Sequence, residues 1–357
     1  MIKRRIICGD AYSFQGDERD VMFLSMVISN DVKFAPLSRD ADIRRFNVAS
    51  SRARNQMWLF HSVDLKDLSE ECVRYSLLNY CENYNKVIVN KNDIEEVFQS
   101  DFQKVTGIQP TLISQNSGTS GMLIIIGEAG KSKTIDALIK AKKIDGNSIK
   151  GKNEKFIIQN ISNPFPGVSE AIVIAGSDKR GTIYGIYEMS QQIGVSPWYY
   201  WADVPVEKKE NLYFKKGIYT DGEPAVEYRG IFLNDEEPSL GGWARATFGG
   251  INSKFYEKVF ELILRMKGNY IWPAMWGKAF YDDDVLNGPL ANEMGIVMGT
   301  SHHEPMAQAQ TDWHRYIKKN NLPNVWDYSK NEKVLQEFWK LGLERSRNWE
   351  KLVSVGM

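Results

Sequence analysis

The chain has 357 residues with 45 basic and 45 acidic side chains, so its formal net charge is zero and its pI is near 6.9. This balance argues against binding to nucleic acid or to an anionic membrane through the charge of the whole chain. No run of about eighteen apolar residues is present, so no membrane span is expected. No apolar segment of signal-peptide length follows the basic N-terminus.

Residue types are distributed unevenly along the chain. All three cysteines lie within the first 85 residues, whereas nine of the ten tryptophans lie at or after Trp198. Unclustered cysteines form neither a disulfide framework nor a metal site, so buried or free thiols and no cofactor are expected. The unevenness predicts two pieces of different origin, residues 1–85 and 86–357.

The first piece has the order of a parallel α/β fold. Apolar runs at residues 20–28 and 57–60 are typical of strands buried on both faces, and a helix is expected at about 70–82. Two motifs accompany them, QGDERD at residues 15–20 and NVASSRARNQ at 47–56. Together they resemble the last two signature motifs of superfamily 1 helicases. Residues 1–85 are therefore expected to be a RecA-type fragment of the second helicase core domain.

The helicase resemblance implies a vestigial nucleotide contact. It places Glu18 beside nucleotide and nucleic acid, and Arg52, with Arg54 as a further candidate, on the γ-phosphate. The alternative is that both arginines lie on a solvated helix face. No glycine-rich phosphate loop is found, because GEAGKS at residues 127–132 has Ile125 where that loop needs glycine. A nucleic-acid-dependent ATPase is therefore the lower-ranked function, and nucleic acid is not the expected partner.

Residues 86–205 are expected to form an α/β layer domain. Short apolar runs alternate with amphipathic segments through this region. Strands are expected at residues 86–89, 123–127, 156–159 and 171–175, and helices at 93–106, 133–143 and 181–194.

Residues 206–357 repeat the order of a strand followed by a helix. Strands are expected at residues 228–233, 270–272, 295–299 and 352–355, and helices at 255–267, 284–294, 304–317 and 330–349. This repetition is typical of a (β/α) barrel, whose eight units take about 250 residues. The region supplies the first three to four units, which predicts an incomplete (β/α)8 barrel.

Polar and aromatic side chains follow these strands at their carboxyl ends, where barrel enzymes carry their active sites. They are Asn234, Asp235, Glu236 and Glu237 after the first strand, Trp272 and Trp276 at the second, and His302, His303 and Glu304 after the third. Carboxylates transfer protons and stabilise an oxocarbenium-like transition state, while indoles stack on the faces of pyranose rings.

Each group also has a structural alternative. The acids could begin a helix as its N-cap and first turn, and the tryptophans could belong to the core. Adjacent histidines are expected in an extended segment, where they point in opposite directions and do not chelate one metal ion together. The shared position at strand ends favours a site over these alternatives.

Five segments of the second piece resemble glycoside hydrolase family 115, whose members are xylan α-1,2-glucuronidases considered to invert the anomeric centre. The segments are IAGSDKRGTIYGIY at residues 174–187, GVSPWYYWADVP at 194–205, YRGIFLNDE at 228–236, WPAMW at 272–276 and GTSHHEPM at 299–306. The resemblance covers residues 86–357. It implies an α/β domain followed by a (β/α)8 catalytic barrel, with xylan or a glucuronoxylan oligosaccharide as substrate.

The resemblance also implies roles for individual residues. The implied catalytic carboxylates are Asp235 and Glu236. The implied contacts with the sugar are His302, His303, Glu304, Trp272, Trp276, Asn234, Lys179 and Arg180. The carboxylate of the uronic acid needs a charge-assisted partner, which the histidines would supply. The alternative for Arg180 is that it bonds loop carbonyls.

We expect little or no activity from this chain. An inverting glycosidase needs an acid and a base on opposite sides of the scissile bond, with room for water between them. Further acidic residues thought to act in catalysis lie in the family beyond the strand that ends at Met357, so at most half of that pair is expected here. The compartment and the oligomeric state stay open. The sequence also leaves open whether the two pieces form a genuine fusion or a gene-model artefact.

Overall fold

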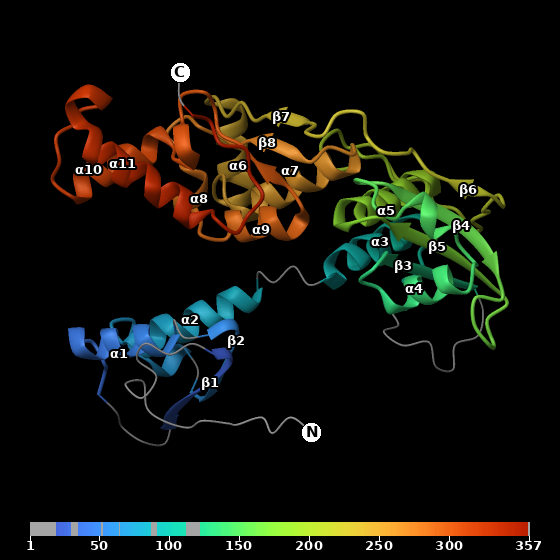
Figure 1. The fold of residues 1–357 in the computed structure, drawn as a ribbon, viewed down its shortest axis with the longest axis horizontal. Coiled ribbons are helices and arrows are strands. Elements are labelled where there is room, and N and C mark those ends of the chain that lie inside the picture. Colours follow the sequence, from blue (N-terminus) through green and yellow to red (C-terminus); the bar gives the residue numbers. More distant parts are fainter. Residues whose placement is uncertain are drawn as a thin grey trace. The chain divides into compact units, whose positions relative to one another are not determined.

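The protein has a mixed α/β fold that divides into two compact units, Met1–Ile88 and Val89–Met357 (Figure 1). The computed structural model describes residues 19–29, 35–50, 53–63, 65–86, 91–111 and 122–355. No helix within these ranges is long and apolar enough to cross a membrane. The division into three domains stays a prediction.

The first unit is built on two parallel strands. β1 (Arg19–Ser29) pairs with β2 (Ala53–Ser62), with Leu24 opposite Leu59. Parallel neighbours need a crossover connection, and α1 (Asp40–Ser50) lies between them in the chain. The 3-10 turn Leu65–Asp67 and α2 (Val73–Lys86) follow. The predicted strands and helix are therefore found, but Lys86 ends a helix and the rest of the strand expected at 86–89 lies outside the described residues.

The second unit begins with a four-stranded sheet in the order β3-β5-β4-β6, in which β3 and β5 are parallel and β4 is antiparallel to both of its neighbours. Its elements are α3 (Lys91–Thr106), β3 (Met122–Glu128), α4 (Lys133–Lys140), the 3-10 turn Gly146–Ser148, β4 (Phe156–Ser162), β5 (Glu170–Gly176), α5 (Lys179–Ile193) and β6 (Ile218–Tyr219). β6 was not predicted from the sequence.

Side-chain alternation along β5 explains the layers around this sheet. Successive residues of a strand face opposite sides. Ile172 and Ile174 accordingly join the core formed with α3 and α5, whereas Val173 and Ala175 join the core formed with α4. The sheet is thus covered on both faces, which is why β5 reads as a continuous apolar run.

A second, parallel sheet has the order β7-β8-β9. Its elements are β7 (Gly230–Phe232), α6 (Ser239–Phe248), α7 (Ser253–Arg265), β8 (Tyr270–Trp272), α8 (Phe280–Asp283), α9 (Asn287–Met294), β9 (Val297–Met298), the 3-10 turn Pro305–Ala307, α10 (Gln310–Lys319) and α11 (Tyr328–Arg345). Three of the four expected strands are present: β8 has the predicted bounds, whereas β7 and β9 are shorter than predicted. The strand expected at 352–355 is replaced by a single parallel bridge between Met298 and Lys351.

Helix α7 shows how the chain connecting β7 and β8 packs. The Asn252 side chain accepts a hydrogen bond from the backbone N–H of Phe255, which caps the first turn. Phe255, Val259 and Ile263 recur at helical spacing and are all buried. This apolar face packs α7 against the core and sets the position at which the chain enters β8.

Candidate active site

Three segments leave β7, β8 and β9 at the same edge of the second sheet. The strand ladder continues past the named strands, because Leu233 N–H donates to Trp272 O (2.9 Å) and Gly299 N–H donates to Ile271 O (2.9 Å). The carboxyl ends of parallel strands meet at one edge of a sheet. The polar and aromatic groups predicted from the sequence therefore start from neighbouring points.

Asp235 joins the segments after β7 and β8. The residue is 2% exposed, and its Oδ1 accepts hydrogen bonds from the backbone N–H groups of Met275 (3.0 Å) and Trp276 (3.3 Å). Its Oδ2 is buried and has no hydrogen-bond partner among the described residues. One oxygen thus fixes the WPAMW segment, and the other is left to accept a proton or a hydrogen bond.

Glu304 is the second buried acid of the site. It is 2% exposed, and its Oε1 accepts a hydrogen bond from Gln310 N–H (3.3 Å). Burial raises the pKa of the Glu304 carboxyl to about 7, and the carboxylates of Asp312 and Asp235 act in the same direction. A carboxyl with such a pKa exists in both protonation states near neutral pH.

A small pocket lies beside Glu304. Its walls include Pro273, Tyr281, Thr300 and Asp312, and it has room for about one water molecule. Asp312 was not predicted as a site residue, because it lies inside α10 and nothing in the local sequence separates it from an ordinary helix residue. Its burial raises its pKa, and Arg345, 3.3 Å from Oδ2, opposes that rise.

The remaining predicted residues of this edge are more accessible. Asn234, Glu236, His302 and His303 are exposed. Among the indoles, Trp276 is 59% exposed. Trp272 is half-buried, and its Nε1–H donates to Tyr270 Oη (2.5 Å). A buried pair of acids is therefore bordered by groups that solvent or a ligand can reach.

The expectation for the two histidines was wrong. His302 and His303 lie in a turn and not in an extended segment, and their ring centroids are 3.9 Å apart. The turn brings both imidazoles to the same side. Within the described ranges, however, no group of three or more His, Cys, Asp and Glu side chains is placed to hold a metal ion.

Glu237 ends the acidic run after β7 and was not assigned a role from the sequence. Both of its oxygens accept hydrogen bonds from Arg245 of α6, at 2.5 and 2.8 Å, and this contact lowers the pKa of the Glu237 carboxyl. Glu236 carries the exposed carboxylate beside it. The acid after β7 that is committed to an ion pair is therefore Glu237.

Lys179 and Arg180 contact the chain just before β9, at the edge of the sheet where β7, β8 and β9 begin. Lys179 Nζ donates to the carbonyls of Asn292 (3.3 Å) and Glu293 (3.2 Å), which end α9. Arg180 Nη1 donates to Gly295 O (3.2 Å), two residues before β9. The structure does not bring these two cations together with Asp235, and it shows the alternative for Arg180, an arginine bonding a loop carbonyl.

The predicted nucleotide contacts belong to the first unit. Glu18 and Arg52 lie outside the described residues. Arg54 lies in β2, so the alternative that placed it on a helix face is wrong for this residue.

Comparisons with known proteins match both pieces. A model of glycosyl hydrolase family 115 matches residues 221–357, and a model of an AAA domain matches residues 3–64. A solved structure described as a novel family GH115 4-O-methyl-alpha-glucuronidase with specificity for decorated arabinogalactans is 33% identical, with a TM-score of 0.62. It matches 73% of this chain, which in turn spans 33% of that structure's length. No match is found among the curated proteins.

These matches confirm the resemblance to family 115. The AAA-domain match covers the segment that carries the helicase-like motifs. The matched residues 221–357 contain β7, β8 and β9 and the three segments that follow them.

Proposed function

Because residues 221–357 match family 115, we propose that the edge formed by the ends of β7, β8 and β9 is part of a glycoside hydrolase site that removes glucuronic acid, or its 4-O-methyl ether, from a polysaccharide. The sequence resemblance predicts xylan as the polysaccharide. The solved relative is described as specific for decorated arabinogalactans, which makes that polymer the second substrate to test.

The observation that carries this proposal is the pair of hydrogen bonds to Asp235 Oδ1, at 3.0 and 3.3 Å, which hold the WPAMW segment against the acid. They leave Oδ2 free for a reacting group, and the exposed Glu236 carboxylate follows directly. We assign Asp235 and Glu236 as the acids that act on the glycosidic bond or its water.

The groups around the acids suit a uronic acid. Trp276 offers an accessible indole face for a sugar ring, and His302 and His303 offer N–H donors to the sugar carboxylate. We further assign Trp272, Asn234 and Glu304 to the walls of the same site.

We also propose that β7, β8 and β9 belong to a (β/α)8 barrel. The described strands β7, β8 and β9 are parallel neighbours in chain order with helices between them, as in the first units of such a barrel. In that arrangement the sheet of β3 to β6 is an N-terminal α/β domain.

Binding is the property to test first. We expect the chain to bind 4-O-methylglucuronic acid, but not the neutral control xylobiose, in saturation-transfer NMR. Trp276→Ala should abolish the transfer, whereas Trp326→Ala, which removes a comparably exposed indole (48% against 59%) on the loop before α11, should leave it intact. Equal signals for the uronic acid and xylobiose, or binding that Trp276→Ala leaves unchanged, would refute the assignment.

Hydrolysis is tested separately. The purified chain is incubated with glucuronoxylan oligosaccharides and with decorated arabinogalactan, and released uronic acid is quantified by chromatography. The expectation of little or no activity stays a prediction, and measurable release that Asp235→Asn eliminates would overturn it while supporting the proposed chemistry.

The AAA-domain match keeps a nucleotide-binding function as the second candidate for residues 3–64. An arginine with a permanent charge and a fixed fork of donors suits a γ-phosphate, and Arg52 would supply it. Titration with a fluorescent ATP analogue tests this. Saturable binding that Arg52→Ala weakens at least tenfold would support the candidate, and no binding at millimolar nucleotide would remove it.

A further inference from the structure

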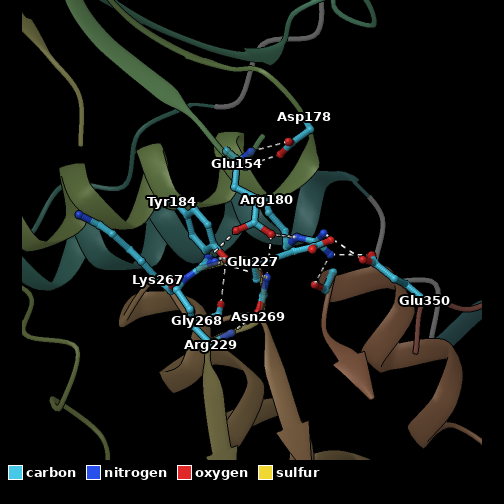
Figure 2. A network of polar contacts seen from close by, with 12 residues as sticks. Glu154, Asp178, Arg180, Tyr184, Glu227, Arg229, Lys267, Gly268, Asn269 and Glu350 are labelled. Atoms are coloured by element: carbon cyan, nitrogen blue, oxygen red, sulfur yellow. Dashed lines mark hydrogen bonds and ion pairs between the residues drawn. The ribbon is translucent and has the colours of Figure 1, made fainter. Parts of the chain in front are cut away.

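Glu154 occupies the centre of a polar network between the two sheets of the second unit (Figure 2). The residue is 7% exposed and has a φ of 51°, a left-handed conformation that is uncommon outside glycine. Its backbone N–H donates to Oδ2 of Asp178 (2.6 Å), and Oδ1 of the same aspartate caps α5 through Gly181 N–H (2.7 Å). These two contacts of Asp178 therefore hold the Glu154 backbone beside the first turn of α5.

The carboxylate of Glu154 accepts hydrogen bonds from three side chains. Arg180 Nε (2.5 Å) and Asn269 Nδ2 (2.8 Å) donate to Oε1, and Arg229 Nη2 donates to Oε2. Arg180 comes from α5, which packs on the sheet of β3 to β6, whereas Arg229 and Asn269 directly precede β7 and β8. One buried anion thus joins the two sheets through two guanidinium groups and an amide.

The two partners from the second sheet are the residues directly before its first two strands. Arg229 precedes β7, and Asn269 precedes β8. Asn269 Oδ1 accepts a hydrogen bond from Arg229 N–H (2.9 Å), and Arg229 O accepts one from Asn269 N–H (2.7 Å). Two residues that contact Glu154 are therefore also bonded to each other at the point where β7 and β8 begin.

The same two strands end at the candidate active site. Each is three residues long and spans about 10 Å of extended chain. At the far end, Asp235 again joins the two strands through its contacts with Met275 and Trp276. A carboxylate therefore contacts residues of both the β7 and the β8 segment at each end of the strand pair.

We propose that Glu154 is a positioning residue for the candidate active site: through Arg229 and Asn269 it sets the register of β7 and β8 and so places Asp235 and Trp276. This inference rests on the proposed function for its biological meaning. The positional claim can be measured without any activity.

The test uses the whole chain labelled with 5-fluorotryptophan, whose ¹⁹F resonances for Trp272 and Trp276 are assigned from single Trp→Phe variants. Glu154→Gln keeps the shape of the side chain and removes its charge. We expect it to shift both resonances and to weaken binding of 4-O-methylglucuronic acid at least fivefold. Glu350→Gln is the matched control. Glu350 is exposed, and its Oε2 lies 2.7 Å from Arg180 Nη1, so this variant removes a carboxylate from the same arginine without touching Glu154. It should shift neither resonance.

A second variant keeps the test decisive if Glu154→Gln fails to fold. Glu154→Asp keeps the charge but shortens the reach, so it should fold and shift the same resonances in the same direction by a smaller amount. Unshifted resonances in both variants, with or without a lower melting temperature, would overturn the proposal. Glu154 would then only stabilise the contact between α5 and the start of β7 and β8. Shifted resonances in a chain whose wild type binds no uronic acid would support the positioning role and refute the proposed function instead.

Discussion

Replacing Arg265 by leucine should destabilise the second unit strongly, because this arginine is the cation between two buried acids. Arg265 Nη2 lies 2.7 Å from Asp101 Oδ2, and its Nε lies 2.9 Å from Glu261 Oε1. The three side chains are 2%, 0% and 8% exposed. Removing one partner of a buried ion pair costs roughly 3–5 kcal/mol, since an uncompensated charge stays in the interior.

The structure places the expected loss at the lower end of that range. Each acid keeps a lysine after the substitution, because Lys104 lies 3.0 Å from Asp101 and Lys258 lies 3.2 Å from Glu261. We therefore expect the free energy of unfolding to fall by about 3 kcal/mol. Urea unfolding followed by tryptophan fluorescence measures it, since nine of the ten tryptophans lie at or after Trp198. With an m-value of about 3 kcal/mol/M, the midpoint should fall by about 1 M.

The pH dependence gives a second test of the same reasoning. Burial alone would raise the pKa of Glu261, but Arg265 and Lys258 outweigh it and hold that pKa below its usual value. A depressed carboxyl pKa stabilises the fold above the unfolded pKa, and this stabilisation is lost as the pH falls through the folded pKa. In Arg265→Leu we expect burial to raise the pKa of Glu261. The difference in unfolding free energy between variant and wild type should therefore narrow as the pH falls from 7 towards 4.5.

The control is Arg315, which pairs with Asp282 (2.5 Å) and Asp283 (2.6 Å) but is 44% exposed. Exposed pairs contribute about 0–1 kcal/mol, so Arg315→Ala should change the unfolding free energy by no more than that. A loss below about 1 kcal/mol for Arg265→Leu, or a gap that stays constant with pH, would refute the electrostatic reasoning.

Three further perturbations follow from the site and its strands. Because the pKa of the Glu304 carboxyl is raised in the folded state, it stabilises the fold fully at pH values below its pKa in the unfolded chain, and this stabilisation is lost as the pH rises. The wild-type free energy of unfolding, measured with urea, should therefore fall by on the order of 3 kcal/mol between pH 4.5 and about 7, and Glu304→Gln should not show this fall. Gly230→Ala should lower the melting temperature sharply or prevent folding, because the added Cβ would lie 1.7 Å from Tyr270 O. Gly242→Ala is the control: it lies in a helix with no atom closer than 3.9 Å to the added Cβ, so the free energy of unfolding should rise by about 0.5–1 kcal/mol. Asp235→Ala should lower stability by about 1–3 kcal/mol, because two backbone N–H groups lose their acceptor, and a loss seen equally in Asp235→Asn would argue against that cause.

Most strands and helices could be predicted because their signals are local. The continuous apolar run of β5 and the helical spacing of Phe255, Val259 and Ile263 depend only on neighbouring residues. Helix α6 was missed because Gly241 and Gly242 weaken its helical signal. Residues 352–355 were wrongly predicted as a strand, because their apolar side chains fit a strand as well as a loop; only the bridge at Lys351 is found.

The site was only partly predictable for the same reason. The position of its residues after parallel strands followed from the chain order, but their exposure and contacts did not. The turn that brings His302 and His303 together, at 3.9 Å, depends on the packing of the chain after β9. The contacts of Glu154 with Arg229 and Asn269 span 75 and 115 residues, so no local pattern could indicate them.

The start of α5 has a consequence for how this scaffold can be recombined. A helix that opens with Lys179 and Arg180 places two cations at the positive end of its own dipole, which is unfavourable in isolation. Arg180 pairs with Glu154, 26 residues earlier. The other compensating partners, the carbonyls that end α9 and the carboxylate of Glu350, are more than a hundred residues further along the chain. The backbone carbonyls are kept in any homologue, but a chimaera that took α5 from one homologue and the segment around residue 350 from another would separate Arg180 from Glu350 wherever that acid is replaced. Exchange between homologues should therefore succeed when the two sheets are inherited together, with the crossover placed before α3.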